Sequence, residues 1–349
     1  MMSHEVAHPL QDARDIEAEL RRLWRSVSSQ AKPVMRARVM TLVVVTEARD
    51  EAKIAAELST MMARHPARTI LLLMDEAHEG AFDASATLFC LPGDHPLYME
   101  QIHLHSSPRS PQRLVSAVRL LLDPSLPSAL WWLLPATAYS TDRDALAALT
   151  DRHIIDSRLG DDPSLFRALP APSVEDLAWE ESERWREMVA ALFDDPAQTP
   201  QLDRLTQVTL VQGGAAAEGW LMVGWLAAQL GWSLSMISPS EWAFLRPDGE
   251  WGKIRLKQAA AAEGLQQIRL ESATQRFEVA RKDEFVTCGR RSKTTDYQIV
   301  LPSHDRSRTT LLSRVLDRVH PDPLYQASRR ALMAALMTNV DSSKLQRKE

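Results

Sequence analysis

Two kinds of apolar pattern alternate along the first part of the chain. Continuous aliphatic and β-branched runs lie at residues 39–45, 69–74 and 130–134, with shorter strand-like segments at 86–91, 98–105 and 152–156. Continuous runs are typical of strands that are covered on both faces of a sheet. Between them, apolar residues recur at helical spacing at 10–27, 54–62, 111–122 and 142–150. This alternation predicts an open, mostly parallel α/β sheet.

The pattern changes after a polar, proline-rich passage at residues 160–173. A helix is predicted at 179–193, and a second α/β unit begins with a strand at 208–211 and a helix at 215–230. Short strands then follow without long helices between them, which predicts an antiparallel meander. These strands are predicted at 251–257, 265–270, 275–280 and 285–288. Two helices, at 308–319 and 323–337, close the pattern.

The patterns together predict an α/β protein of two units. The first is an N-terminal α/β domain with a leading helix, residues 1–160, and a connector with a tryptophan-bearing helix follows at 161–205. The second is a smaller α/β domain with antiparallel strands and C-terminal helices, residues 206–340. The polar residues 341–349 are expected to be a frayed tail.

Composition narrows the class of protein. The chain has 349 residues, of which 45% are hydrophobic and 25% charged, the balance of a soluble globular protein. Cys90 and Cys288 are the only cysteines, which excludes a disulfide scaffold and predicts a reducing, cytoplasmic location. No apolar run approaches the roughly 20 residues of a membrane span, and no secretion signal is recognisable. We expect no membrane association.

The net charge of −5 is unevenly distributed. Residues 142–203 carry 15 acidic and 6 basic side chains, whereas residues 276–349 carry 15 basic and 9 acidic ones. Solvated faces of opposite sign account for this distribution, and a contact surface for an acidic partner or for phosphate groups is the alternative. Only one aromatic residue lies near Arg290 and Arg291, and together with the overall acidity this argues against nucleic-acid binding.

Two histidine patterns suggest metal binding, but neither is complete. Residues 4–8 match the zinc pattern H-E-x-x-H, which requires a helix, and Pro9 disfavours helical geometry just before it. His103 and His105 share one face of a predicted strand, with His95 nearby, but no acidic or cysteine ligand accompanies them in the sequence. We interpret the first pattern as a chance match and the second as a polar sheet face.

Gly213 and Gly214 stand between a predicted strand and a predicted helix, where α/β folds bind phosphate groups. Neither G-x-G-x-x-G nor G-x-x-x-x-G-K-[ST] can be written there, and a tight turn explains the glycines equally well. The pair is therefore kept as a candidate anion site. No nucleophile elbow and no spaced pair of carboxylates occurs, so the residues predict no catalytic, cofactor-binding or metal-binding set.

Tryptophan is unusually frequent, with 10 residues against 4 tyrosines. Core packing explains any single tryptophan, but the set is typical of a protein whose surfaces dock on a partner. The tryptophans cluster as Trp131 with Trp132, Trp179 with Trp185, Trp220 with Trp225 and Trp232, and Trp242 with Trp251.

Several blocks, in order, carry a family likeness. They are residues 16–24 (IEAELRRLW), 36–45 (RARVMTLVVV), 65–68 (HPAR), 127–132 (PSALWW), 151–157 (DRHIIDS), 176–179 (DLAW) followed by Trp185 and Arg186, and 221–232 (LMVGWLAAQLGW). Through these blocks the chain resembles the OpcA family, the glucose-6-phosphate dehydrogenase assembly proteins. It departs from the family pattern at Arg184, where a proline is usual, and it lacks the close cysteine pair that thiol control would need.

The resemblance implies a non-catalytic cytoplasmic protein that binds glucose-6-phosphate dehydrogenase and promotes its active state, without a cofactor of its own. The competing hypothesis is an enzyme or sensor that binds a sugar phosphate or nucleotide near Gly213 and Gly214. Five residues are candidate contacts with the dehydrogenase: Trp179, Trp185 and Arg186 from the family block, and Arg290 and Arg291 from the basic region.

Overall fold

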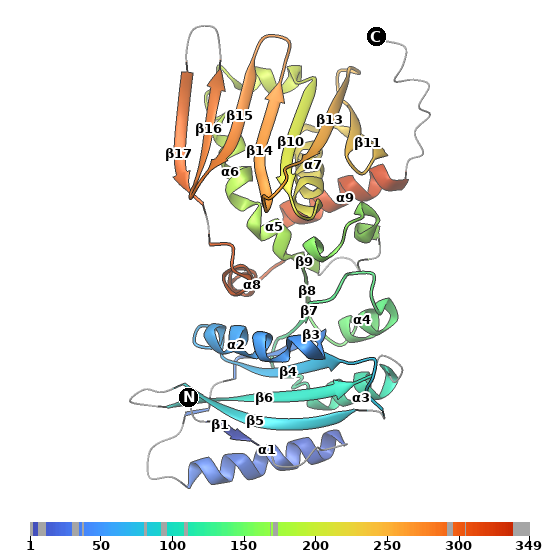
Figure 1. Cartoon of the computed structure of the whole chain (residues 1–349), viewed down its shortest axis with the longest axis vertical. Coiled ribbons are helices and arrows are strands. Elements are labelled where there is room, and N and C mark those ends of the chain that lie inside the picture. The colour runs from blue at the N-terminus through green and yellow to red at the C-terminus, as the bar shows by residue number, and fades with distance from the viewer. Residues whose placement is uncertain are drawn as a thin grey trace. The chain divides into compact units, whose positions relative to one another are not determined.

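The computed structural model describes residues 3–5, 12–29, 35–36, 38–79, 82–91, 96–107, 111–167, 169, 174–291, 296–303 and 305–337, which form two compact units (Figure 1). The first unit lies within Met1–Asp156, Ser173–Glu175 and Ser307–Val319. The second lies within Ser157–Pro172, Asp176–Arg306 and His320–Glu349. Both units are therefore assembled from separate stretches of chain. His8, His95 and the tail at 341–349 fall outside the described residues.

The first unit is built on a nine-stranded sheet in the order β1-β5-β6-β4-β3-β7-β8-β9, with β2 paired to β6. The strands are β1 (Ser3–Glu5), β2 (Met35–Arg36), β3 (Met40–Glu47), β4 (Ala67–Met74), β5 (Asp83–Leu91), β6 (Leu97–Ser106), β7 (Ser128–Trp132), β8 (Arg152–Ile155) and β9 (Val174–Asp176). Neighbours from β6 through β4, β3 and β7 to β8 run parallel, whereas β5 and β1 are antiparallel additions. The predicted open, mostly parallel sheet is confirmed.

The helices of this unit cover both faces of its sheet. They are α1 (Ala13–Ser28), α2 (Glu51–Met61), α3 (Pro111–Leu121), α4 (Ser140–Ala147) and α8 (Arg308–Asp317). The side chain of Asp12 caps α1 by accepting a hydrogen bond from the Arg14 amide, and the predicted apolar stripe of α1, from Ile16 to Val27, is buried. Figure 1 shows α1 and α2 on opposite sides of the sheet. In addition, α1 contacts α3 and β5.

The core of the first unit runs along β3, β4 and β7. Every residue of β4 and β7 is buried, and Trp131 and Trp132 are 0% and 1% exposed. These two tryptophans lie on a strand between β3 and β8, as predicted. Because both faces of β7 are covered, its side chains need not alternate between apolar and polar.

The second unit contains an eight-stranded sheet in the order β11-β12-β13-β10-β14-β15-β16-β17. The strands are β10 (Gln207–Gly213), β11 (Ser233–Ser238), β12 (Glu241–Leu245), β13 (Trp251–Gln258), β14 (Gly264–Glu271), β15 (Arg276–Lys282), β16 (Phe285–Arg291) and β17 (Asp296–Pro302). Only the β10–β13 pair is parallel, and β14 to β17 form the predicted antiparallel meander. The sequence patterns had not indicated β11, β12 or β17.

The described helices of the second unit are α5 (Leu177–Glu181), α6 (Glu183–Ala191), α7 (Ala217–Leu230) and α9 (Pro323–Met337). The single helix predicted at 179–193 is two helices that meet at Ser182. Helix α7 ends at Gly231, whose φ of 64° is the left-handed conformation that glycine adopts without strain. Within the described part of the chain, no helix is long and apolar enough to cross a bilayer.

We predict that Trp132→Ala lowers the free energy of unfolding by roughly 3–5 kcal/mol, because it removes a large, fully packed side chain from the sheet interior. Chemical denaturation monitored by circular dichroism measures this loss. Trp251→Ala is the matched control, because Trp251 is 39% exposed and leaves a much smaller cavity. Equal effects of the two substitutions would contradict the assignment of β7 to the core.

Candidate functional site

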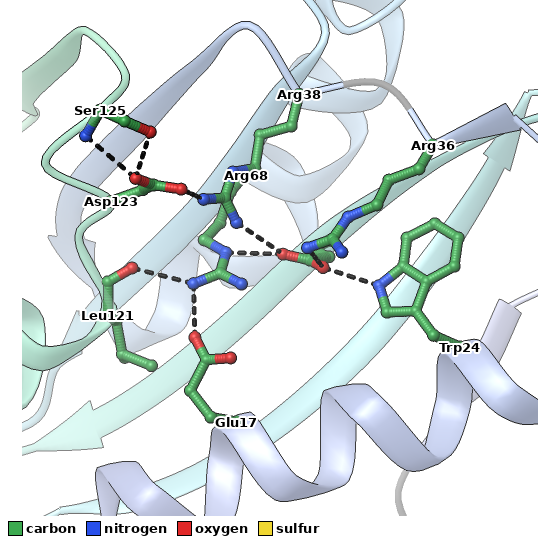
Figure 2. Close-up of polar contacts among 9 residues, drawn as sticks. Glu17, Trp24, Arg36, Arg38, Arg68, Leu121, Asp123 and Ser125 are labelled. Atoms are coloured by element: carbon green, nitrogen blue, oxygen red, sulfur yellow. Dashed lines mark hydrogen bonds and ion pairs between the residues drawn. The ribbon is translucent and has the colours of Figure 1, made fainter.

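Glu100 on β6 is a buried carboxylate that several residues of one polar cluster contact, among them Arg68, Arg36 and Trp24 (Figure 2). It accepts hydrogen bonds from Arg68 Nε at 2.6 Å, Arg36 Nη2 at 2.5 Å and Trp24 Nε1 at 2.6 Å. Arg38 Nη1 lies 3.6 Å from the same carboxylate. Because the Glu100 side chain is only 2% exposed, these donors replace the water that it would otherwise bind.

The cluster joins segments that are distant in sequence. Arg68 Nη1 also contacts Glu17 Oε1 of α1 at 2.6 Å and the carbonyl of Leu121 at 2.9 Å, and Arg38 donates to Asp123. Three guanidinium groups thus face three carboxylates, and the charges balance. Burial alone would raise the pKa of Glu100, but the adjacent Arg68 guanidinium and the donated hydrogen bonds hold that pKa below its ordinary value.

Residues from three of the family-like blocks meet in this cluster, although nothing in the sequence indicated that these blocks are close in space. Trp24, Arg36 and Arg68 each belong to one of these blocks, whereas Glu100 was not singled out at all. The sequence signal that could have indicated Glu100 is a lone carboxylate within an apolar strand, because a carboxylate is almost never buried without a partner. The cluster lies at the amino ends of β3 and β4, away from the carboxyl ends of the strands where open α/β sheets bind nucleotides.

The opposite, carboxyl edge of this sheet is where an α/β fold would bind a dinucleotide. The turn that follows β3, residues 47–51, contains no glycine and carries Glu47, Asp50 and Glu51. A pyrophosphate needs close approach to backbone amides and a positive surrounding potential, and this turn offers neither. The residues at this edge therefore do not fit a nicotinamide dinucleotide.

The two histidines of β6 also face this edge. His103 Nδ1 lies 2.5 Å from Glu51 Oε1, and His105 Nε2 lies 3.4 Å from Glu51 Oε2. The sequence had not indicated this acidic neighbour, because Glu51 is far from both histidines along the chain. In the described ranges, no group of three or more His, Cys, Asp or Glu side chains is placed to hold a metal ion. Ser3–Glu5 form a strand, not the helix that the H-E-x-x-H pattern requires.

The candidate anion site of the second unit lies where β10 leads into α7. A Cβ on Gly213 would come 2.0 Å from the Ala262 carbonyl oxygen, and Gly214 has a φ of 66°, so close packing and turn geometry account for both glycines. The nearby amide of Gly219 donates to Gln212 Oε1 at 3.0 Å. Anion binding at Gly213 and Gly214 stays a prediction.

Two buried carboxylates, Glu181 and Glu218, meet beside this turn. Glu218 accepts a hydrogen bond from the Leu265 amide at 3.1 Å and lies 4.0 Å from Arg306 Nη2. Glu181 accepts hydrogen bonds from both Arg158 and Arg306. Burial, and then the charge of Glu181, raise the pKa of Glu218 from 4.5 to about 7. Two buried groups therefore compete for the same cations, and Glu218 is the weaker competitor.

The three candidate partner residues of the family block are buried. Trp179 donates from Nε1 to Asp322 Oδ2 at 2.7 Å, and the Arg186 guanidinium carbon lies 3.4 Å from the centroid of the Trp179 ring. Arg186 also donates to the carbonyl of Trp179 at 2.7 Å, while Trp185 is 1% exposed. Their contacts hold α5, α6 and α9 together. Because these side chains are buried, they can affect partner binding only indirectly, through the positions of the surface residues around them.

Arg290 and Arg291, the other candidate contacts, lie at the end of β16. Their backbones pair with Phe277 and Arg276 of β15 on one side and with Tyr297 and Asp296 of β17 on the other. Their role as charge contacts stays a prediction.

Comparison with protein families matches most of the chain. The model for the glucose-6-phosphate dehydrogenase subunit N-terminal domain matches residues 58–169, and the model for the corresponding C-terminal domain matches residues 172–329. A relative named OxPP cycle protein OpcA from Synechocystis is 24% identical over 185 residues, 50% of this chain and 39% of the relative. Its Nostoc punctiforme counterpart is 26% identical over 180 residues, 48% of this chain and 39% of the relative. The chain thus matches about two fifths of the length of these relatives.

Comparison with solved structures finds matches over most of the chain at low identity. A 3-ketoreductase from Actinomadura kijaniata, in complex with TDP-benzene and NADP, has a TM-score of 0.48 and 12% identity, covering 87% of this chain and 97% of its own. Levoglucosan dehydrogenase, in complex with NADH and L-sorbose, has a TM-score of 0.46 and 11% identity, covering 85% and 96%. These scores carry no inference about the chemistry of this chain.

Removing the central carboxylate should destabilise the first unit strongly. We expect Glu100→Ala to cost roughly 3–5 kcal/mol, because it leaves the buried Arg68 guanidinium without its main counter-ion. Glu19→Ala, which breaks only the exposed ion pair with Arg22, is the control and should cost at most about 1 kcal/mol. Urea denaturation of both variants measures the difference, and similar losses would show that the cluster does not stabilise the fold.

The raised pKa of Glu218 predicts a pH-dependent stability. The folded state holds this proton more tightly than the unfolded chain, so the contribution of Glu218 to stability falls as pH rises from 4.5 to about 7. Glu218→Gln should therefore raise the melting temperature by several degrees at about pH 8 and little at about pH 5. Glu241→Gln, at a half-exposed carboxylate, is the control. A shift that is the same at both pH values would contradict the assignment.

Proposed function

Because this chain belongs to the OpcA family of glucose-6-phosphate dehydrogenase assembly proteins, we propose that it binds the dehydrogenase and promotes its active oligomeric state. The observation that supports this most directly is the ordered match of both family domains, at residues 58–169 and 172–329. The names of the relatives tie the family to the oxidative pentose phosphate pathway. We place the protein in the cytoplasm, where that dehydrogenase works.

The residues also favour a binding role over catalysis. The turn after β3 does not fit a dinucleotide, and Glu100 and Glu181 are each occupied by arginines of the same unit. Glu100 is engaged by Arg36 and Arg68, and Glu181 by Arg158 and Arg306. Side chains that are held in this way stabilise a surface and are poorly placed to exchange protons with a substrate.

An assembly protein acts by binding one state of its partner better than another. To convert a mostly inactive dehydrogenase population into a mostly active one, the difference in binding free energy must reach about 5.5 kcal/mol. Binding across an oligomer interface can supply such a difference, because the inactive, dissociated form offers only part of the surface.

We expect the purified protein to have no dehydrogenase activity of its own. Added to the dehydrogenase of the same cell, it should lower the apparent KM or shift the enzyme to a larger oligomer, measured by activity titration and by light scattering. Arg290→Glu with Arg291→Glu should weaken this effect if these residues are charge contacts, whereas the control Lys257→Glu with Lys282→Glu should not.

The outcome that would contradict the proposal is equally direct. If wild-type protein at micromolar concentration changes neither the activity nor the size of the dehydrogenase, the assembly role is wrong. A thermal-shift screen with sugar phosphates and nicotinamide nucleotides then tests the competing sensor hypothesis, since a ligand of the native state raises its melting temperature.

A further inference from the structure

The outer side of α1 carries a stripe of arginines. Arg14, Arg21 and Arg25 are exposed, and they follow one another by seven and four residues, about two turns and one turn of helix. They therefore lie along one side of the helix, while its apolar side is buried in the first unit. Arg25 Nε donates a hydrogen bond of 3.4 Å to the backbone carbonyl oxygen of Arg21, which holds the Arg25 side chain along the helix.

This stripe keeps its charge available. Two of the three carboxylates of α1 are engaged away from the stripe, since Glu17 contacts Arg68 at 2.6 Å and Glu19 contacts Arg22 at 2.5 Å, and the third is Asp15 beside Arg14. Among the described residues, no ion pair joins Arg14, Arg21 or Arg25 to an acidic side chain. An exposed row of like charges repels itself unless an anionic group approaches, so the stripe favours an acidic partner.

The Glu100 cluster extends the basic surface beside Trp24. The Arg36 guanidinium carbon lies 5.0 Å from the centroid of the Trp24 ring, and the Arg36 side chain is 50% exposed (Figure 2). Arg36 Nη2 also donates a hydrogen bond of 2.5 Å to Glu100 Oε1, which fixes the position of its guanidinium group. An arginine positioned in this way on a tryptophan is the type of group that dominates binding energy at protein interfaces.

An open pocket of about 360 Å³ lies near the other end of the helix, between the start of α1 and α3. Its apolar lining comes from Phe82, Ala117 and Leu120, and Arg113 and the α1 cap residue Asp12 also line it. Leu120 is 60% exposed, so its side chain is accessible to a partner at the rim of this pocket. The pocket is open to a partner, and apolar side chains that seat in such depressions are common anchors at protein interfaces.

We propose that the surface made by the arginine stripe of α1 and the pocket between α1 and α3, here called the α1–α3 surface, binds an acidic segment of a protein partner. One apolar side chain of that segment is seated in the pocket. The arginine stripe pairs with the carboxylates, and Phe82, Ala117 and Leu120 contact the anchor. In identifying the partner as the dehydrogenase, the inference rests on the proposed function, but the chemistry of the surface does not depend on it.

Other occupants fit less well. A membrane-bound helix must insert its apolar side into lipid, whereas the apolar side of α1 is already buried. Nucleic acid is disfavoured by the net charge of −5 and by the acidic side chain of Asp12 in the pocket wall. A protein segment can contact both the arginine stripe and the pocket, because it can present carboxylates and one apolar side chain together.

The test uses the full chain with two variants. Arg14→Glu, Arg21→Glu and Arg25→Glu together should slow association with the dehydrogenase roughly tenfold and flatten its salt dependence. Leu120→Asp should instead speed dissociation roughly tenfold, because it places a charge in the pocket. The matched control is Lys53→Glu, Arg204→Glu and Lys257→Glu, which changes the net charge equally at exposed positions elsewhere. Biolayer interferometry measures both rates, and melting temperatures confirm that each variant folds.

A second arm separates failure of the inference from failure of the proposed function. A fluorescent glutamate-rich peptide with one central phenylalanine should bind the wild type, and its binding should weaken in both variants and on replacing that phenylalanine by serine. If the peptide behaves in this way and the dehydrogenase does not bind, the inference stands and the proposed function falls. Equal binding by wild type and variants in both arms would overturn the inference. So would arginine-dependent binding to phosphatidylserine vesicles, or a dimer of this chain that Leu120→Asp dissociates.

Discussion

The first unit depends on how one buried negative charge is neutralised. A carboxylate that is removed from water is tolerated only when paired and hydrogen-bonded, and Glu100 meets that condition with donors from Trp24, Arg36 and Arg68. Because these donors come from α1, β2 and β4, the requirement for neutrality also sets where those elements lie. An apolar residue at this position would not specify the same arrangement of neighbours.

The second unit also buries a carboxylate near arginines, but there the pKa of the carboxylate is raised instead of lowered. Glu100 has several donors and a lowered pKa, whereas Glu218 competes with Glu181 for shared arginines and has a pKa raised to about 7. The difference lies in the donors that reach each carboxylate: Glu100 accepts three side-chain hydrogen bonds, whereas Glu218 accepts one from the Leu265 amide and lies 4.0 Å from Arg306, so burial dominates its pKa. One cluster therefore stabilises its unit at neutral pH, while the other makes stability depend on pH.

The pattern of apolar residues predicted the strands and helices that are buried along their whole length. It failed for short strands whose position depends on pairing with distant parts of the chain. The runs at β3, β4 and β7 and the limits of α9 follow from apolar periodicity, but β11 and β12 are short strands without a strong run of their own. The break at Ser182 left no proline or glycine to mark it. Glu100, Glu181 and Glu218 could not be grouped with their arginines, because sequence spacing carries no information about contacts between distant segments. Trp179 and Trp185, whose aromatic character suggested a docking surface, are both buried, and their contribution to partner binding stays a prediction.

Each unit takes its last helix from the far end of the chain. Within the first unit, α8 returns to α2, where Arg308 contacts Glu57 at 2.6 Å and Asp317 contacts Arg64 at 2.5 Å. In the second, α9 packs so closely on α7 that a Cβ at Gly224 would come 2.5 Å from the Ser328 carbonyl oxygen. During synthesis, therefore, neither unit contains all of its packed helices until the strands of the second sheet have been made. The nascent first unit therefore leaves the side of α2 that α8 contacts uncovered while the second sheet is translated, and surface exposed in this way favours aggregation of an incompletely folded chain.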